Sequence, residues 1–402
     1  MAYTRGIEIK EINMQAVKIR DNIYWVGAID WNLRNFHGYE TGRGSTYNAY
    51  LVIDEHITLI DTVKAQFSGE MIERIESVCP VESIDYIISN HVEPDHSGAI
   101  KDIVAKNPDV TVFTSFPSGE KGLRAYYGDM KYRPIKSGES ISLGKNTVNF
   151  VTTPMVHWPD NMVAYFVEEK ILFSNDALGE HYATAERFAS EVDKCKLFQE
   201  VDKYYANIVL PYSAQVRNVL KVVDTLDISM IAPSHGVVWD TYVDEVIERY
   251  NTLANATFEE KSAVVVYDTM WHSTEEMARA IAEGFREKGV KVIMKDLKYN
   301  HESDVIVDVM KAQYVAVGSP TLNNHMMPNV AKFLCYMSGL TNKNKKYVAF
   351  GSYGWGGQSI AEVDKQLEDM KLERMTDMIR VQYRPTEETL ANIKEQIVSA
   401  ID

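Results

Sequence analysis

Cysteine is scarce in this chain of 402 residues, which contains three cysteines at positions 79, 195 and 335. Their number is odd, they lie far apart, and no Cys-x-x-Cys pair is present, so a disulfide framework is excluded. We expect three reduced and mostly buried thiols. That expectation places the protein in a reducing compartment, the cytoplasm.

Long apolar runs are also absent. No stretch approaches the roughly 18 apolar residues that a membrane-spanning helix needs. Residues 1–12 are mixed and charged, without the apolar region of a signal peptide. The sequence therefore predicts neither a membrane span nor secretion.

Positive charge is in the minority, with 42 lysine and arginine residues against 57 aspartate and glutamate residues and a net charge of −15. Phosphate groups repel such a surface, which argues against a nucleic-acid partner. A small-molecule substrate or a cationic protein partner is compatible with this balance.

What is present is enough apolar sequence for two ordinary domains, since 45% of the residues are hydrophobic and 25% are charged. Up to about residue 250, short β-branched and aromatic runs alternate with turns and one clear amphipathic helix over 68–78. This mixture predicts a layered α/β domain. The strands are predicted at 22–29, 48–53, 57–61, 84–89, 147–153, 163–167, 171–174 and 230–234.

The pattern changes after the polar segment 251–260. Continuous apolar runs at 263–267, 314–318 and 347–351 are typical of strands covered on both faces, and helical stretches lie between them. This alternation predicts an open, doubly wound parallel sheet. We place the domain boundary near Ala256, which gives domains 1–256 and 257–402.

The clearest chemical motif is His91-Val-Glu93-Pro-Asp95-His96, directly after a predicted strand. With 10 histidines and 57 acidic residues in the chain, this spacing is expected only about 0.005 times by chance. His157, Asp176 and His235 likewise follow apolar runs. Loops at the ends of sheet strands are where ligands converge on a rigid support, so the set predicts a metal site.

Taken singly, each of these later residues has an ordinary structural explanation. An isolated His157 or His235 is more often a hydrogen-bonded core or surface histidine, and an isolated Asp176 is more often a turn residue or a helix N-cap. The metal site therefore rests on the set as a whole.

Three loops in the second half follow strands of the predicted parallel sheet. The first lies between a strand and an amphipathic helix, where backbone amides can bind phosphate. The predicted sheet resembles that of the flavodoxins, in which a flavin mononucleotide (FMN) lies outside the carboxyl ends of the strands. A ligand-free helix start or a plain glycine turn would look similar in any single loop. The predicted FMN-binding residues are Thr269, Met270, Trp271, His272, Ser273, Thr274, Ser319, Pro320, Thr321, Leu322, Asn323, Asn324, Ser352, Tyr353, Gly354, Trp355, Gly356 and Gly357.

The first half resembles the metallo-β-lactamase superfamily, whose zinc hydrolases carry His-x-His-x-Asp-His followed by further His, Asp and His. Glu93 stands here in place of the second histidine. Hard carboxylate ligands favour iron or manganese over zinc. The loop at 269–274 resembles the flavodoxin phosphate loop, although Trp271 and His272 replace its central glycine.

Both halves together resemble the flavodiiron proteins over nearly the whole chain, including the segments 30–38, 46–50, 157–160, 204–207 and 267–271. The resemblance implies a metallo-β-lactamase-like αββα sandwich followed by a flavodoxin-like domain. It also implies two non-haem irons, one bound by His91, Glu93 and His157 and the other by Asp95, His96 and His235, with Asp176 bridging. His96 is not a ligand in every member. His37 and Tyr204 match residues of the family's substrate pocket, and either could equally be a structural residue.

The resemblance further implies reduction of nitric oxide to nitrous oxide or of dioxygen to water, two substrates that the ligand set does not rank. It implies a head-to-tail homodimer or a tetramer. The electron donor is expected to be external, because we see no further domain after the flavodoxin-like part. Rubredoxin, another flavoprotein and a reduced deazaflavin coenzyme all remain open. The alternatives are a two-zinc metallo-hydrolase with a flavodoxin-like module and an electron carrier with a vestigial metal site.

Overall fold

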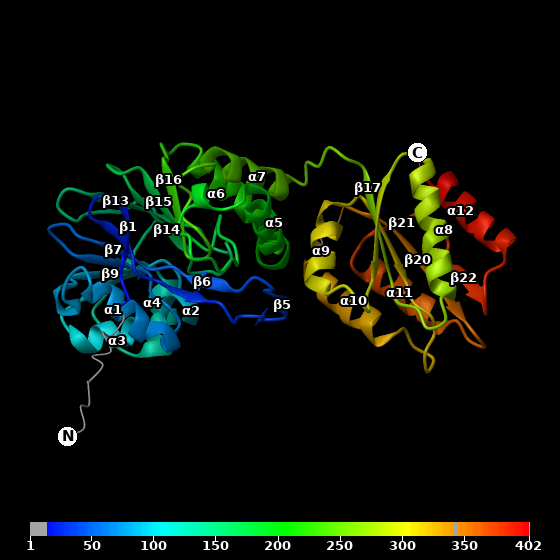
Figure 1. Ribbon diagram of the computed structural model, residues 1–402, viewed down its shortest axis with the longest axis horizontal. Helices are drawn as coiled ribbons and strands as arrows, with labels where there is room; N and C mark the ends of the chain where they lie inside the picture. The colour runs from blue at the N-terminus through cyan, green and yellow to red at the C-terminus, as the bar shows by residue number, and fades with distance from the viewer. Residues whose placement is uncertain (1–13, 341–343, 402) are drawn as a thin grey trace, which may run out of the picture. The chain divides into compact units, whose positions relative to one another are not determined.

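The computed structural model describes residues 14–340 and 344–401, and these form two compact units (Figure 1). The first unit comprises 14–34, 41–201 and 218–247, and the second comprises 35–40, 202–217, 248–340 and 344–401. The segment 1–12, predicted to carry no signal peptide, lies outside the described residues. No helix within the described ranges is long and apolar enough to cross a membrane.

Two mixed sheets form the centre of the first unit. The larger has the order β1-β2-β7-β8-β9-β10-β11 and the smaller the order β12-β13-β14-β15-β16. The strands of the larger sheet are β1 (Val17–Arg20), β2 (Ile23–Trp25), β7 (Tyr50–Val52), β8 (Thr58–Ile60), β9 (Tyr86–Ser89), β10 (Thr111–Ser115) and β11 (Tyr132–Ile135). Those of the smaller are β12 (Ser140–Ser142), β13 (Thr147–Thr152), β14 (Met162–Phe166), β15 (Ile171–Asn175) and β16 (Met230–Pro233).

The two faces of the larger sheet contribute side chains to two different hydrophobic cores. Ile60, Ile88 and Phe113 share a cluster with residues of the smaller sheet, such as Phe150 and Phe173. Their sequence neighbours Leu59, Ile87 and Val112 pack instead with helical residues, including Met71, Ile103 and Leu123. Successive strand residues point to opposite faces, so one sheet contacts both the second sheet and the helices. Those helices are α1 (Ser68–Glu76), α3 (Ile100–Lys106) and α4 (Ser118–Tyr127).

One predicted strand is divided in the structure. The sequence predicts a single strand over 22–29, but β2 ends at Trp25 and β3 (Ala28–Asp30) pairs instead with β6 (Ser45–Tyr47). Gly27 lies at the break, where a β-carbon would stand 2.2 Å from the carbonyl oxygen of Tyr47. Only glycine permits this close approach, so the chain changes sheets there.

The second unit contains a parallel sheet of order β18-β17-β19-β20, with β21 and β22 both pairing with β20. This is the flavodoxin-like order, and it confirms the predicted doubly wound sheet. The strands are β17 (Ser262–Tyr267), β18 (Lys291–Asp296), β19 (Tyr314–Gly318), β20 (Lys346–Tyr353), β21 (Glu373–Arg374) and β22 (Ile379–Gln382). The hairpin β4 (Asn35–Phe36) and β5 (Tyr39–Glu40) also groups with this unit.

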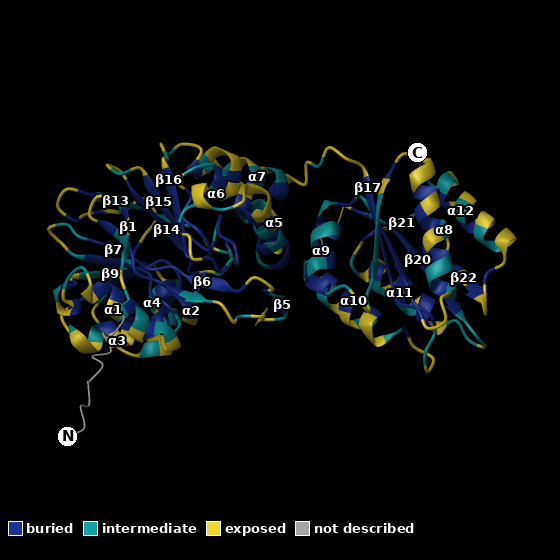
Figure 2. Ribbon diagram, in the orientation of Figure 1, coloured by how far each residue is buried: buried dark blue, intermediate teal, exposed yellow. Residues whose placement is uncertain are grey.

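Helices α8 (Ser273–Glu287) and α12 (Glu387–Ser399) pack together on one face of this sheet through residues such as Ile281, Phe285 and Ile397. Strands β17, β19 and β20 are mostly buried, whereas Figure 2 shows that the helices carry exposed residues along their outer sides. The remaining helices are α2 (Pro94–Ser97), α5 (Lys194–Tyr204), α6 (Ser213–Val223), α7 (Val243–Asn255), α9 (Glu302–Lys311), α10 (Pro328–Leu340) and α11 (Gln358–Asp369).

The cysteines are free thiols, but the expectation that they are mostly buried is wrong. Cys195 and Cys335 are exposed, and Cys79 is partly buried. Cys335 lies on α10 beside Phe333 and Leu334, which point into the core. One residue further along a helix the side chain points about 100° away, so Cys335 faces outward.

Candidate metal and flavin sites

The first unit brings all seven predicted metal ligands together. They form two groups in which one atom of each residue lies within 4.8 Å of the others: His91, Glu93, His157 and Asp176 in one, and Asp95, His96 and His235 in the other. Each member follows the carboxyl end of a strand, as the sequence predicts for a site on a rigid support.

The local backbone explains how one short motif serves both groups. His91 and Glu93 follow β9 directly and precede α2, and both belong to the first group. Pro94 then starts α2, and its ring is well suited to a first helical position. The turn into α2 directs Asp95 and His96 to the second group.

Asp176 joins the two groups. Its Oδ2 lies 3.2 Å from Nε2 of His157 and 3.6 Å from Nε2 of His91. Its Oδ1 lies 2.9 Å from Nε2 of His96 and 3.5 Å from Nε2 of His235. The two oxygens of one carboxylate therefore face two different pairs of imidazoles.

The other two carboxylates serve one group each. Oε2 of Glu93 lies 3.3 Å from Nε2 of His91 and 3.5 Å from Nε2 of His157. Asp95 reaches Nε2 of His96 and of His235 at 3.4 Å, with a different oxygen for each. Each group thus has its own carboxylate in addition to a share of Asp176.

Several buried polar atoms of this cluster make no hydrogen bond of good geometry within the described part of the chain, although imidazoles lie close to them. They are both carboxylate oxygens of Asp95, both of Asp176 and both ring nitrogens of His96. Burying such atoms unsatisfied is costly, so each calls for an explanation. A metal ion on each side of Asp176 would satisfy the carboxylate oxygens and one nitrogen of His96.

Electrostatics favours the charged form of these groups. Burial raises the pKa of Asp176, but the neighbouring histidines outweigh burial and hold this pKa well below its usual range. Burial likewise lowers the pKa of His96, but Asp95 and Asp176 outweigh it and raise this pKa to about 9. Anionic carboxylates in a buried pocket are what a cation site requires.

Two histidines are oriented by partners to which sequence reasoning assigned no role. Nδ1 of His91 donates to Oδ2 of Asp160 (2.8 Å), and the amide of Val92 donates to the same oxygen (2.8 Å). Nδ1 of His235 donates to the backbone carbonyl of Thr46 (2.6 Å). Both contacts leave Nε2 facing the cluster, as is usual for a ligating histidine. Asp160 is the last residue of the segment 157–160. Its place in that motif is the feature of the sequence from which a role at the site could have been predicted.

His181 was missed entirely. It is buried, its ring centroid lies 4.6 Å from that of His235, and its Nδ1 lies 2.7 Å from Oγ of Ser45. Burial lowers the pKa of His181 well below the usual value, and the neighbouring His235 acts in the same direction. It is therefore a neutral imidazole beside the cluster, and no spacing pattern in the sequence marks it.

His37 and Tyr204 are not brought into either ligand group. His37 is exposed at the turn between β4 and β5, and Tyr204 is buried at the end of α5. Both segments group with the second compact unit, whereas the seven candidate ligands belong to the first. A substrate-binding role for these two residues stays a prediction.

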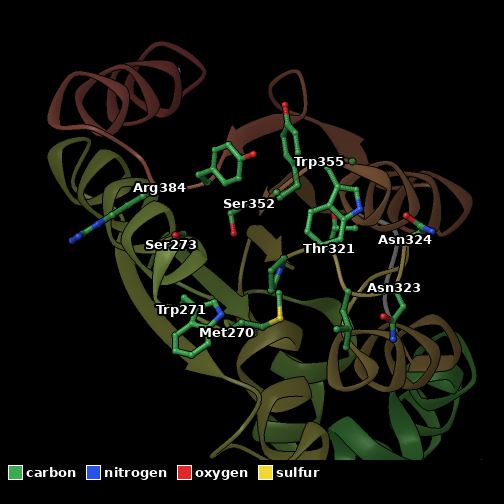
Figure 3. A pocket seen from close by; sticks show the side chains of 15 residues that line it. Met270, Trp271, Ser273, Thr321, Asn323, Asn324, Ser352, Trp355 and Arg384 are labelled. Atoms are coloured by element: carbon green, nitrogen blue, oxygen red, sulfur yellow. The ribbon is translucent and has the colours of Figure 1, made fainter.

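The second unit contains a cavity of about 510 Å³ at the carboxyl ends of β17, β19 and β20 (Figure 3). All three predicted flavin loops contribute to its lining, together with Tyr383 and Arg384, which the sequence analysis missed. The predicted lining residues are Met270, Trp271, Ser273, Pro320, Thr321, Leu322, Asn323, Asn324, Ser352, Tyr353, Gly354, Trp355 and Gly356.

The other predicted flavin residues lie around this cavity without lining it. Thr274 and Ser319 are buried, and the hydroxyl of Thr274 is 2.9 Å from that of Ser352. Thr269 is buried, and its hydroxyl has no hydrogen-bond partner among the described residues. An unsatisfied hydroxyl beside the start of α8 fits a phosphate group. His272 is exposed and contacts Glu275, and Gly357 precedes α11.

Known proteins share this combination of domains. Residues 46–236 match the family described as ODP family beta lactamase, and residues 265–396 match the flavodoxin family. A nitric oxide reductase of Moorella thermoacetica is 41% identical, with 95% of this chain and 97% of that protein covered. A rubredoxin-oxygen oxidoreductase of Megalodesulfovibrio gigas is also 41% identical, with 95% and 96% covered.

A solved structure agrees with these relatives. The flavodiiron protein from Giardia intestinalis superposes with a TM-score of 0.92 at 35% identity, over 96% of each chain. Identity at this level covers nearly the whole length of the chain, and therefore both domains. The chain therefore belongs to the flavodiiron protein family, as the resemblance in its motifs predicts.

Proposed function

We propose that this protein is a flavodiiron oxidoreductase, which reduces nitric oxide to nitrous oxide or dioxygen to water. The observation that carries the proposal is the position of Asp176 between two buried groups of histidines and carboxylates. A closely spaced metal pair, about 3.5–4 Å apart, is typical of two-metal catalytic sites. The relatives named for nitric oxide and for oxygen reduction support the same reaction class.

The proposed metals are two non-haem irons. One is bound by His91, Glu93 and His157, and the other by Asp95, His96 and His235, with Asp176 bridging. Glu93, Asp95 and Asp176 are hard oxygen ligands, which favour iron over zinc. The unsatisfied buried oxygens of Asp95 and Asp176 support this assignment.

FMN is the proposed flavin, bound by the three loops that the sequence predicts, over 269–274, 319–324 and 352–357. The glycines of the third loop let the backbone approach a ring closely, and Trp355 and Tyr353 offer aromatic faces. The flavodoxin family match over 265–396 supports this binding site.

When bound, the flavin and the irons supply the redox chemistry, in which two nitric oxide molecules take up two electrons and two protons, or dioxygen takes up four of each. The chain's own residues hold these groups and exclude bulk water. Asp160 and the carbonyl of Thr46 fix His91 and His235 with Nε2 facing the cluster. His37 and Tyr204 are proposed to line the substrate pocket.

The wider setting is also proposed. A rubredoxin-type protein is the proposed donor, supported by the name of the Megalodesulfovibrio relative, while another flavoprotein or a reduced deazaflavin coenzyme would meet the same need. We propose a head-to-tail homodimer or a tetramer, acting in the cytoplasm. The three free thiols agree with a reducing compartment.

A domain boundary at Ala256 lies between the two family matches.

An anaerobic single-turnover experiment tests this proposal. The protein is loaded with iron and FMN, reduced fully, and mixed separately with nitric oxide or dioxygen while flavin absorbance and nitrous oxide are followed. We expect rapid flavin reoxidation by at least one gas. The matched control is the same FMN-loaded chain carrying zinc, which cannot change its oxidation state.

The outcome decides between the proposal and its alternatives. Rapid reoxidation that is lost with zinc supports a diiron reductase and ranks the two gases. Equal rates with iron and zinc would mean that the flavin reacts directly and the metal site is vestigial. Hydrolysis of a thioester, lactone or phosphodiester by the zinc form, without gas reduction by the iron form, would support a metallo-hydrolase.

A further inference from the structure

Arg384 is the one charged residue among the described residues that line the flavin cavity. It follows β22 and precedes α12, in a loop to which the sequence analysis assigned no function. Figure 3 shows it at the same end of the cavity as Ser273, with its guanidinium directed away from the other lining side chains. Ser273 begins α8, so Arg384 lies at the end of the cavity suited to a phosphate group.

That end of the cavity has an unfavourable feature for an anion. The first turn of α8 carries two carboxylates, Glu275 and Glu276. The helix dipole attracts a phosphate to this turn, but two negative side chains repel it. The dipole is therefore effective for phosphate binding only if the charge of these carboxylates is offset.

Both carboxylates are in fact paired. Glu275 contacts Arg279 at 2.6 Å and His272 at 2.8 Å. Glu276 contacts the guanidinium of Arg384 at 2.8 Å. Among the described residues, Arg384 is the one that both lines the cavity and forms an ion pair with a carboxylate in the first turn of α8.

We propose that Arg384, by pairing with Glu276, makes this end of the cavity selective for a phosphorylated flavin over an unphosphorylated one. The inference rests on the proposed FMN site and adds a selectivity residue to it. Arg384 acts here through Glu276, so it is a positioning and charge-balancing residue. Its effect is confined to ligands that carry a phosphomonoester, because only those place a negative charge beside Glu276.

The test compares two flavins that differ only in the phosphate. Flavin-free full-length protein is titrated with FMN and with riboflavin, and the dissociation constants are measured by quenching of flavin fluorescence at low and high salt. The variants are Arg384→Gln, Glu276→Gln and the double variant. The side chain of Arg384 is 78% exposed, so its replacement leaves the core intact. Arg380→Gln is the matched control, since Arg380 is exposed on β22 and does not line the cavity.

We expect Arg384→Gln to weaken FMN binding about five-fold at low salt, as for loss of one favourable charge near a helix start. Riboflavin binding is expected to stay unchanged, and the FMN effect to shrink at high salt. The double variant is expected to regain most of the lost affinity, because it carries neither charge. Arg380→Gln is expected to behave as the wild type.

Four results would overturn the inference. Equal weakening of FMN and riboflavin would show a steric role, and no weakening would show that Arg384 is irrelevant to binding. A double variant as weak as Arg384→Gln would show that Arg384 does not act through Glu276. If the wild type bound neither flavin, the proposed FMN site itself would fail, and this inference with it.

Discussion

The two candidate sites both lie at the carboxyl ends of sheet strands, yet they consist of different kinds of chemical groups. The metal cluster consists of buried charged side chains, such as Asp95 and Asp176, at 3% and 1% exposure. The flavin cavity is lined by backbone loops, amides, hydroxyls and aromatic rings, and Trp355 and Trp271 are 90% and 87% exposed. Charge concentrated on a few atoms makes each ligand indispensable, whereas a large lining with Arg384 as its one charged residue spreads the binding energy over many contacts.

The largest effect is expected from removing the carboxylate that joins the two ligand groups. Asp176→Ala takes away the one side chain that faces both histidine pairs, so we expect loss of at least one iron per chain and a fall in gas reduction of about 1,000-fold or more. Iron content by elemental analysis and single-turnover rates measure this. FMN content should stay unchanged.

The control for this variant is Asp129→Ala, which removes an exposed carboxylate that is 93% accessible and is paired only at the surface. It should keep both irons. If Asp176→Ala also kept two irons and full activity, the cluster would not be organised around a bridging carboxylate. The proposed difference between the two sites would then be wrong.

A smaller effect is expected from Asp160→Asn. The amide retains the shape of the carboxylate that orients His91, but it removes the charge that holds the Nδ1 proton. Outer partners of this kind typically contribute about 10- to 100-fold in metal affinity. A competition titration with a chelator measures the iron affinity. An affinity equal to that of the wild type would show that the backbone alone orients His91.

The flavin cavity should respond more gently. Trp355→Ala removes one aromatic face from a lining of many residues, so we expect FMN affinity to fall about ten-fold while both irons remain. Tyr299→Ala is the matched control, since Tyr299 is 84% exposed and does not line this cavity. Complete loss of FMN, or loss of iron, would show that the cavity tolerates the loss of one side chain no better than the metal cluster does.

The smallest effect concerns Glu180, a buried carboxyl whose Oε1 accepts from the amide of Val237 (2.9 Å). Burial raises its pKa well above the usual value. Such a group favours the folded state below its unfolded pKa and loses that contribution as pH rises through its folded pKa. Glu180→Gln keeps an acceptor and removes the ionisation.

The melting temperatures of the two proteins should therefore agree at pH 4, below the unfolded pKa of a glutamate (about 4.3). The variant should become the more stable as pH rises toward 8. Apo protein is used for both, so that metal binding does not contribute. Parallel curves across the whole pH range would show that folding does not raise the pKa of Glu180.

Much of both domains could be predicted because their signals are local. The continuous apolar run at 263–267 and the amphipathic helix predicted beside the first flavin loop correspond closely to β17 and α8. The predicted strand over 22–29 was wrong because its division depends on a contact between Gly27 and Tyr47, which are distant in the sequence. A glycine within a run of strand-forming residues does not by itself show which other segment of the backbone packs against it.

The sequence by itself determined the chemistry of this protein. The residue types in the motif at 91–96, with Glu93 in place of a histidine, already favoured iron, and three loops after apolar runs already favoured a flavin. Only the tertiary structure decided which atoms meet: that Asp176 faces two histidine pairs, that Asp160 orients His91, that His181 lies beside His235, and that Arg384 holds Glu276. The physical reason is that ligand preference belongs to single side chains, whereas distance and orientation are set by how separate strands pack together.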